Sequence, residues 1–168
     1  ALKTFPSLVQ NLIDGERDKC DEIRGVFSKV KLSRAGDGPL EEIGEELDIE
    51  TEIPLDYEGY LGSLEEKCPG TSPSLLFETS RGCWWGERSH CTFCGLNGST
   101  MNYRAMTPER ALRQFDEMFK YFPRVSRFES VDNIMPRKYL TTVWPRVKPP
   151  EGVCLFYEVK ADLKDQEI

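Results

Sequence analysis

The segment from Ser74 to Gly98 reads SLLFETSRGCWWGERSHCTFCGLNG, and it decides the fold class expected for the chain. It begins with residues 74–79, a short apolar run of the kind that forms a buried β-strand. The run ends just before three cysteines, Cys83, Cys91 and Cys94. In α/β folds the loops after the carboxyl ends of strands hold the functional groups. The segment therefore predicts a strand that leads directly into a functional loop.

Three cysteines in one loop indicate a particular kind of metal centre. A cubic [4Fe–4S] cluster has four irons, so a protein that supplies three thiolates leaves one iron open. An open iron can bind a ligand or a substrate, which favours a reaction site over an electron-transfer relay. The interpretation makes Cys83, Cys91 and Cys94 the cluster ligands.

Two other uses of the cysteines are chemically possible. Zinc accepts Cys₃His and Cys₄ ligand sets, so His90 or Cys68 could complete a structural zinc site with the three loop cysteines. Such sites usually pair one Cys-x₂-Cys with a second close pair, and the sequence has no second pair. A disulfide scaffold is disfavoured by the large apolar content of the chain. The remaining cysteines, Cys20, Cys68 and Cys154, are expected to be buried small apolar residues.

The sequence after the loop predicts alternating helices and strands. Thr107 is a favoured N-cap and Pro108 is favoured at the first helical position, so a helix should begin there and end near Phe122. Further strands are expected at residues 127–134 and 153–159, with a second helix between them. About three β/α steps make an α/β fold equal to half of a β/α barrel. Half a barrel leaves strand edges unpaired, so the chain is expected to be a poorly soluble fragment.

Charge narrows the classes of partner. The 168 residues carry a net charge of −7, which argues against a nucleic-acid-binding surface. No apolar run has the length of a transmembrane helix, so no membrane partner is expected and a cytoplasmic location is predicted. Residues 37–66 contain twelve acidic residues and no basic residue. Such a block is typical of a solvated linker, which is placed at residues 34–72, mostly helical or irregular.

The cysteine segment resembles a known superfamily. A strand ending in three cysteines, with Cys-x-aromatic-Cys last, is similar to the radical S-adenosylmethionine (radical SAM) enzymes, although seven and then two residues separate the cysteines here, where three and two are usual. The words Gly-Cys-Trp-Trp-Gly (82–86) and Cys-Thr-Phe-Cys-Gly-Leu-Asn-Gly (91–98) resemble a narrower group. That group is the cobalamin-dependent radical SAM C-methyltransferases of ribosomal-peptide (bacteriocin) maturation. Segments 128–134 and 155–163 fit the same group.

The resemblance implies a fold, cofactors and partners. Residues 73–168 would be the first part of a radical SAM barrel, and residues 1–33 the helical tail of an upstream cobalamin-binding domain missing from this chain. The chain would bind a [4Fe–4S] cluster and S-adenosylmethionine, and cleave the latter reductively to a 5′-deoxyadenosyl radical. Cobalamin would then supply a methyl group to carbon of a precursor peptide. A flavodoxin or ferredoxin type of electron donor is implied, and the fragment alone is expected to be inactive.

Two alternatives remain open at this point. A radical SAM enzyme that crosslinks or epimerises a peptide without methyl transfer would share every argument from the cysteines. A non-enzymatic zinc-binding module would share the cysteines but not the reaction.

Residues near the cofactor are also implied by the resemblance. The cofactor-binding predictions are Phe93, Gly95, Asp132, Asn133, Glu158 and Lys160. The aromatic residue would pack beside the adenine, and the glycine would permit close backbone approach. Asp132 and Asn133 end the second strand, where the superfamily usually has Gly-Gly-Glu for the methionine amine. Glu158 and Lys160 share one side of the third strand, where they would face S-adenosylmethionine or pair with each other.

Overall fold

The computed structural model describes residues 3–35, 47–95 and 102–167. The chain forms two compact units, Ala1–Thr51 and Glu52–Ile168, and each is described by itself. The division at residue 51 falls inside the predicted linker, so the predicted boundaries at residues 33 and 72 stay predictions. The part of the predicted linker between residues 36 and 46 lies outside the described residues.

The N-terminal unit is helical. It contains α1 (Thr4–Ile13), α2 (Arg17–Cys20) and α3 (Lys29–Ala35). Helix α1 ends shortly before Gly15, whose φ of +76° favours glycine and does not continue a helix. No residue of α1 is buried, so its apolar face is exposed within this unit. Whether the unit is the tail of an upstream domain stays a prediction.

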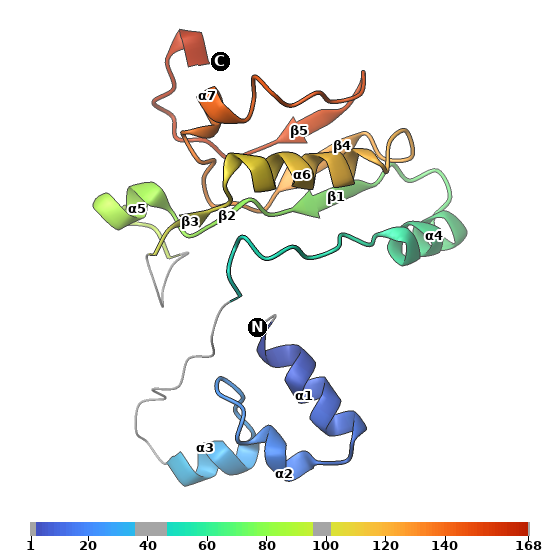
Figure 1. The fold of residues 1–168 in the computed structure, drawn as a ribbon, viewed down its shortest axis with the longest axis vertical. Coiled ribbons are helices and arrows are strands. Elements are labelled where there is room, and N and C mark those ends of the chain that lie inside the picture. The colour runs from blue at the N-terminus through green and yellow to red at the C-terminus, as the bar shows by residue number, and fades with distance from the viewer. Residues whose placement is uncertain (1–2, 36–46, 96–101, 168) are drawn as a thin grey trace. The chain divides into compact units, whose positions relative to one another are not determined.

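The second unit is built on a parallel sheet. Its strands are β1 (Ser74–Phe77), β4 (Arg127–Ser130) and β5 (Cys154–Phe156), in the order β1-β4-β5. Both neighbouring pairs are parallel, as Figure 1 shows. Helix α6 (Pro108–Phe119) connects β1 to β4, and α7 (Tyr139–Thr142) lies between β4 and β5. The predicted α/β fold with alternating helices is confirmed, and it is consistent with part of a β/α barrel.

Helix α6 begins as its sequence predicts. The Thr107 side chain accepts a hydrogen bond from the Arg110 backbone N–H, and Pro108 occupies the first turn. The helix ends at Phe119, earlier than the predicted Phe122, because the chain continues in turns with hydrogen bonds to the third preceding residue.

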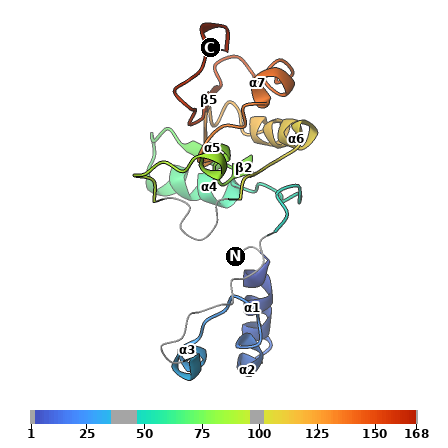
Figure 2. The ribbon, with the colours of Figure 1, turned by 90° about the vertical axis from the view of Figure 1, so that its left-hand side faces the viewer.

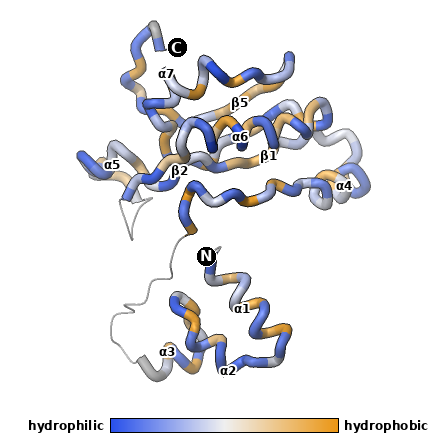
Figure 3. Tube along the Cα trace, in the orientation of Figure 1, coloured by the Kyte–Doolittle hydropathy of each residue, from blue (hydrophilic) through white to orange (hydrophobic). Residues whose placement is uncertain are grey.

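One face of the sheet is packed by helices. The Phe77 and Phe115 rings lie 5.7 Å apart, and Trp144 bridges from Phe115 to Tyr157 beside β5. Helices α6 and α7 lie on the same side of the sheet (Figure 2). Hydrophobic residues recur along α6 and β1 in Figure 3, and in α6 they lie on the buried face.

The other face of the sheet is open in the described unit. Leu76 and Phe156 are both paired with Glu129 in the central strand, so the three residues form one row across the sheet. Leu76 is 54% exposed and Phe156 is 44% exposed. The open row is what a partial barrel predicts, because the barrel interior is filled only when further strands close it.

Further short elements complete the second unit. They are α4 (Glu58–Lys67), β2 (Ser80–Arg81), α5 (Trp84–Arg88), β3 (Arg104–Ala105) and a terminal 3₁₀ turn (Asp165–Glu167). Helix α4 is tied to the turn after α6, since Arg124 pairs with both Glu58 and Glu65. In the described ranges, no helix combines the length and the apolar composition needed to cross a membrane.

Two of the cysteines expected in the core lie at the surface. Cys20 is buried, but Cys68 and Cys154 are exposed free thiols, so the prediction is wrong for both. Cys68 follows the last turn of α4, and Cys154 opens the edge strand β5. Local composition does not distinguish a strand edge or a helix end from a core position, because exposure there depends on which neighbours arrive.

Candidate functional site

The cysteine loop is closed at its base by a short antiparallel ladder. Strand β2 pairs with β3, with Ser80 opposite Ala105 and Arg81 opposite Arg104. The Met106 backbone N–H also donates to the Thr79 carbonyl at 2.9 Å. The loop therefore begins and ends at the carboxyl end of β1. This ladder was not predicted, since two-residue strands are too short to show an alternating pattern.

Gly82 is required at the start of the loop. Its φ is +79°, and a Cβ atom there would lie 2.3 Å from the Asn102 carbonyl oxygen. The close backbone approach is thus at the residue just before Cys83. In the described part of the chain, nothing lies within 4 Å of the position that a Cβ atom would take at Gly95, and its predicted role beside the cofactor stays a prediction.

Cys83 caps a short helix inside the loop. Its Sγ accepts a hydrogen bond from the Gly86 backbone N–H at 3.3 Å, at the start of α5. At the end of α5 the Glu87 carboxylate accepts from the Tyr103 N–H at 2.9 Å, which ties the helix to the returning strand. The helix was not predicted, because five residues do not establish a helical period.

The three loop cysteines supply the right donor atoms for a cluster. Cys83, Cys91 and Cys94 are free and partly exposed, and a turn from the Cys94 N–H to the Cys91 carbonyl holds the last two close in the chain. In the described residues, no three side chains of the metal-binding types gather closely enough to hold an ion. Cysteine sulfurs are the ligands that a [4Fe–4S] cluster requires, so the residue types fit. In the described residues, however, the three thiols are not gathered into one metal-binding group.

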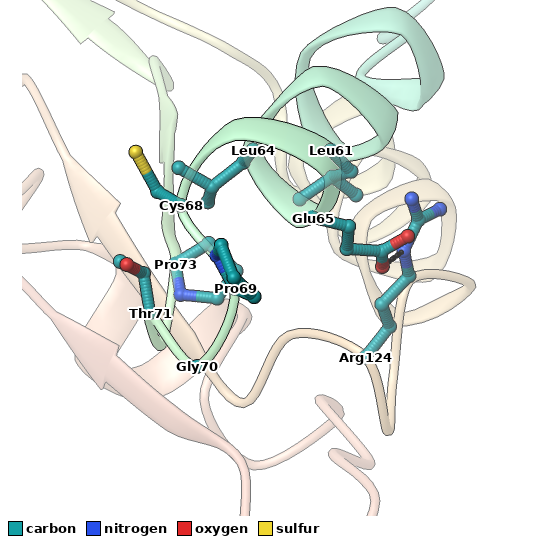
Figure 4. Close-up of a pocket in the computed structure, with 9 residues that line it drawn as sticks. All are labelled: Leu61, Leu64, Glu65, Cys68, Pro69, Gly70, Thr71, Pro73 and Arg124. Carbon is teal, nitrogen blue, oxygen red and sulfur yellow. Dashed lines mark hydrogen bonds and ion pairs between the residues drawn. The ribbon is translucent and has the colours of Figure 1, made fainter.

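The structure argues against Cys68 as the fourth ligand of the alternative zinc site. Cys68 lies on the segment before β1, beside Pro69 and Pro73 in the pocket of Figure 4, whereas Cys83 follows the opposite end of that strand. A site that needs both would have to span the strand. His90 is exposed in the loop, next to Cys91.

Asp132 joins the ends of two strands directly below the loop. It is 2% exposed, and it accepts from the Thr79 N–H at 2.7 Å, the Thr79 hydroxyl at 2.6 Å and the Ser80 hydroxyl at 2.9 Å. Burial raises the pKa of Asp132, and these hydrogen bonds oppose the rise. Both carboxylate oxygens are therefore directed at the start of the cysteine loop. The neighbouring Asn133 is half-buried.

Tyr157, the residue directly after strand β5, contacts the same group of side chains. The Tyr157 hydroxyl lies 2.9 Å from the Thr79 hydroxyl. The pKa of this phenol is raised well above its ordinary value, mainly by burial and to a smaller extent by the negative charge of Asp132. The carboxyl ends of β1, β4 and β5 thus lie together at one edge of the sheet. Figure 1 shows α5 and the β2–β3 ladder at that end of the sheet.

Two tryptophans dock α5 onto this rim. The Trp84 indole N–H donates to the Met135 carbonyl at 3.1 Å. The Lys160 ammonium lies 4.3 Å from the centre of the Trp85 ring, within the range of a cation–π contact. The local sequence around both tryptophans does not show which segment they meet.

The remaining predicted residues are placed as follows. Lys160 pairs with Asp162 at 2.6 Å, and the predicted pairing with Glu158 is not the one the structure shows. The Glu158 side chain is exposed, and its carbonyl accepts from the Met135 N–H at 2.8 Å. The Phe93 ring is 91% exposed, so its surface is open to a partner.

Comparison with known proteins gives one distant similarity. No family model matches the sequence, and no solved structure matches it. The chain is 29% identical over 124 residues to 4′-phospho-dehydrooxetanocin synthase from Priestia megaterium, a cobalamin-dependent radical SAM enzyme. The match covers 69% of this chain and 16% of that enzyme, so the chain spans only a small part of the protein that it resembles. The chain is thus similar, distantly and over part of its length, to a cobalamin-dependent radical SAM enzyme.

Proposed function

We propose that this chain is the cluster-binding part of a radical SAM enzyme, with Cys83, Cys91 and Cys94 as ligands of a [4Fe–4S] cluster. The observation that carries the proposal is the position of the three free thiols. They lie on one loop, closed onto the carboxyl end of a parallel strand. When bound, such a cluster would supply the electron that cleaves S-adenosylmethionine to methionine and a 5′-deoxyadenosyl radical.

The residues around the loop would hold the cluster and its ligand in place. The Gly86 N–H would orient the Cys83 sulfur, to which it donates a hydrogen bond at 3.3 Å. Asp132 would position the start of the loop through Thr79 and Ser80, because its carboxylate is already occupied by them. Lys160 would hold Trp85 and hence α5, acting as a positioning residue rather than as a contact to S-adenosylmethionine.

Contacts to S-adenosylmethionine are proposed for residues with open surface at the same rim. Phe93 offers an exposed ring on which the adenine could stack. Asn133 and Glu158 follow the ends of β4 and β5, where they could meet the amine of the methionine group. Gly95 directly follows the last cysteine and would leave room for the cofactor.

The reaction proposed for the whole protein is C-methylation of a ribosomally synthesised peptide. Cobalamin would be bound by a domain outside this chain, and a flavodoxin or ferredoxin would deliver the electron. The support is the resemblance of residues 82–86 and 91–98 to peptide-maturing methyltransferases. The name of the similar enzyme refers to 4′-phospho-dehydrooxetanocin, so the peptide substrate does not rest on that similarity.

Anaerobic reconstitution with iron and sulfide tests the cluster. About four irons per chain are expected, with broad absorbance that changes on reduction. Cys83→Ala, Cys91→Ala and Cys94→Ala should each abolish the cluster. Cys68→Ala and Cys154→Ala are matched controls, since both remove exposed free thiols away from the loop, and both should leave iron content unchanged. One tightly bound zinc and no uptake of iron would contradict the proposal.

Product analysis of the full-length protein tests the finer assignment. With S-adenosylmethionine, a reductant, cobalamin and a precursor peptide, we expect a methyl group on carbon. Both 5′-deoxyadenosine and S-adenosylhomocysteine should form, the second from re-methylation of cobalamin. Formation of 5′-deoxyadenosine alone, independent of cobalamin, would instead indicate a crosslinking or epimerising enzyme.

A further inference from the structure

A cavity away from the cysteine loop has the properties of a ligand site. It has a volume of about 480 Å³ and lies between residues 52–55 and helix α6. This volume falls within the range of about 300–1,000 Å³ that is usual for small-molecule pockets. One wall is apolar, formed by Ile53, Pro54 and Leu55. The wall on α6 is polar and charged.

Two buried polar side chains line the α6 wall. Arg110 and Gln114 are 3% and 4% exposed, and a separation of four residues puts them on the same side of the helix. The Arg110 Nε is buried and has no hydrogen-bond partner in the described part of the chain. A buried charge without a partner is costly, and proteins normally pair it or hydrogen-bond it. The Arg110 guanidinium could therefore bind an anionic group of a ligand.

The other charges of the lining are already matched or exposed. Arg113 pairs with Glu52 at 2.9 Å, and both side chains are exposed. Glu117 pairs with Lys120 at 2.6 Å. Asp116 is exposed on the same helix. Among the described lining residues, Arg110 is thus the cation for which no ion pair is found, and the acidic neighbours would repel a doubly charged anion.

We propose that this cavity binds a monocarboxylate with an apolar body. A guanidinium and a carboxylate have matching planar geometry, which permits two parallel hydrogen bonds. The Gln114 amide could donate a further bond to the same group. The apolar body would then lie against Ile53, Pro54 and Leu55. The inference does not depend on the cluster, because the lining contains no residue of the cysteine loop.

Thermal unfolding of the full chain with 3-phenylpropionate as the probe tests the inference. At about tenfold the dissociation constant, the melting temperature should rise by roughly 3–5 °C. The neutral 3-phenylpropanamide should give no rise, and phenyl phosphate should give a smaller one. The NMR resonance of the Arg110 Nε–H should shift only with the carboxylate.

Variants separate binding from a purely structural role. Arg110→Met keeps an unbranched side chain about as long as the arginine stem and removes the guanidinium, so the ligand-induced rise should vanish. Without ligand, its melting temperature should equal or exceed that of the unmodified chain, because a buried unpaired charge is gone. Arg110→Lys should retain a reduced rise. The control Arg127→Met removes an exposed arginine that pairs with Glu129, and it should keep the full rise.

Several results would overturn the inference. One is the absence of a shift in melting temperature and in the Arg110 resonance with 3-phenylpropionate. Another is stronger binding of phenyl phosphate. A third is an unliganded Arg110→Met chain that melts several degrees lower, which would make Arg110 a structural residue.

Discussion

The Asp132 carboxylate offers the sharpest test of how the strand ends hold the cysteine loop. Asp132→Ala removes the acceptor of three hydrogen bonds, from the Thr79 N–H and from the Thr79 and Ser80 hydroxyls. The hydroxyls have other neighbours, since Ser80 also lies 3.3 Å from the Ile134 carbonyl and Thr79 lies 2.9 Å from the Tyr157 hydroxyl. The buried Thr79 N–H has no such neighbour among these contacts.

The expected loss of stability follows from those contacts. A buried donor left unsatisfied costs about 1–3 kcal/mol, and the loss of charge-assisted bonds adds to it. Removal of a buried carboxylate offsets part of this loss, since burial disfavours its charged form. We therefore expect Asp132→Ala to lower the free energy of unfolding by about 2–4 kcal/mol. Asp132→Asn should cost about 1 kcal/mol, because its amide oxygen can still accept from the Thr79 N–H.

The pH dependence provides a second measurement. Burial raises the pKa of Asp132 above the unfolded value of about 3.9, so the folded protein holds this proton more tightly. The contribution of Asp132 to stability is then largest below about pH 4 and declines as the pH rises through the folded pKa. Asp132→Asn does not titrate at this position. The stability difference between the unmodified chain and this variant should narrow as the pH rises across that window.

Urea unfolding at several pH values would measure both effects. The exposed residue Glu151 gives a control, since Glu151→Ala should change stability by no more than about 0.5 kcal/mol. If Asp132→Ala proved as mild as that control, the carboxylate would not hold the strand ends together. A difference that widened with rising pH would show that the pKa is lowered rather than raised.

Other predictions follow from single contacts. Gly82→Ala should destabilise the chain by about 2–4 kcal/mol in urea unfolding, because its Cβ would meet the Asn102 carbonyl. Gly59→Ala, in a helix with open space around the residue, should stabilise the chain by about 0.4–1 kcal/mol. Equal effects of the two substitutions would refute the close approach at Gly82. Thr107→Ala should lose about 1 kcal/mol with the N-cap of α6, and Thr107→Ser should lose little; no loss in either would show that the cap is unimportant. Phe93→Ala should leave the stability and the iron content of the chain unchanged, because the residue is exposed. Calorimetry should show S-adenosylmethionine binding weakened by about 1–3 kcal/mol. Loss of the cluster in this variant would instead make Phe93 a packing residue.

The sequence by itself predicted the α/β core and the alternation of its strands and helices along the chain. The strands predicted at residues 74–79, 127–134 and 153–159 form, although the structure ends them earlier, at Phe77, Ser130 and Phe156. Thr107 and Pro108 identify the start of α6. The three cysteines were also predictable as a group, because their chemistry and close spacing are visible without any partner. These features depend on residues near one another in the chain, so local pattern contains them.

Only the tertiary structure decided which groups meet at the site. Asp132 contacts Thr79 across 53 positions in the chain, and Lys160 reaches Trp85 only after β5 aligns beside β4. The β2–β3 ladder depends on the return of the chain after the loop, and the exposure of Cys154 depends on its strand lying at an edge. Such contacts are set by strand register and by the order of strands in the sheet. A linear pattern of residue types does not encode either quantity, because both arise when distant segments pack together.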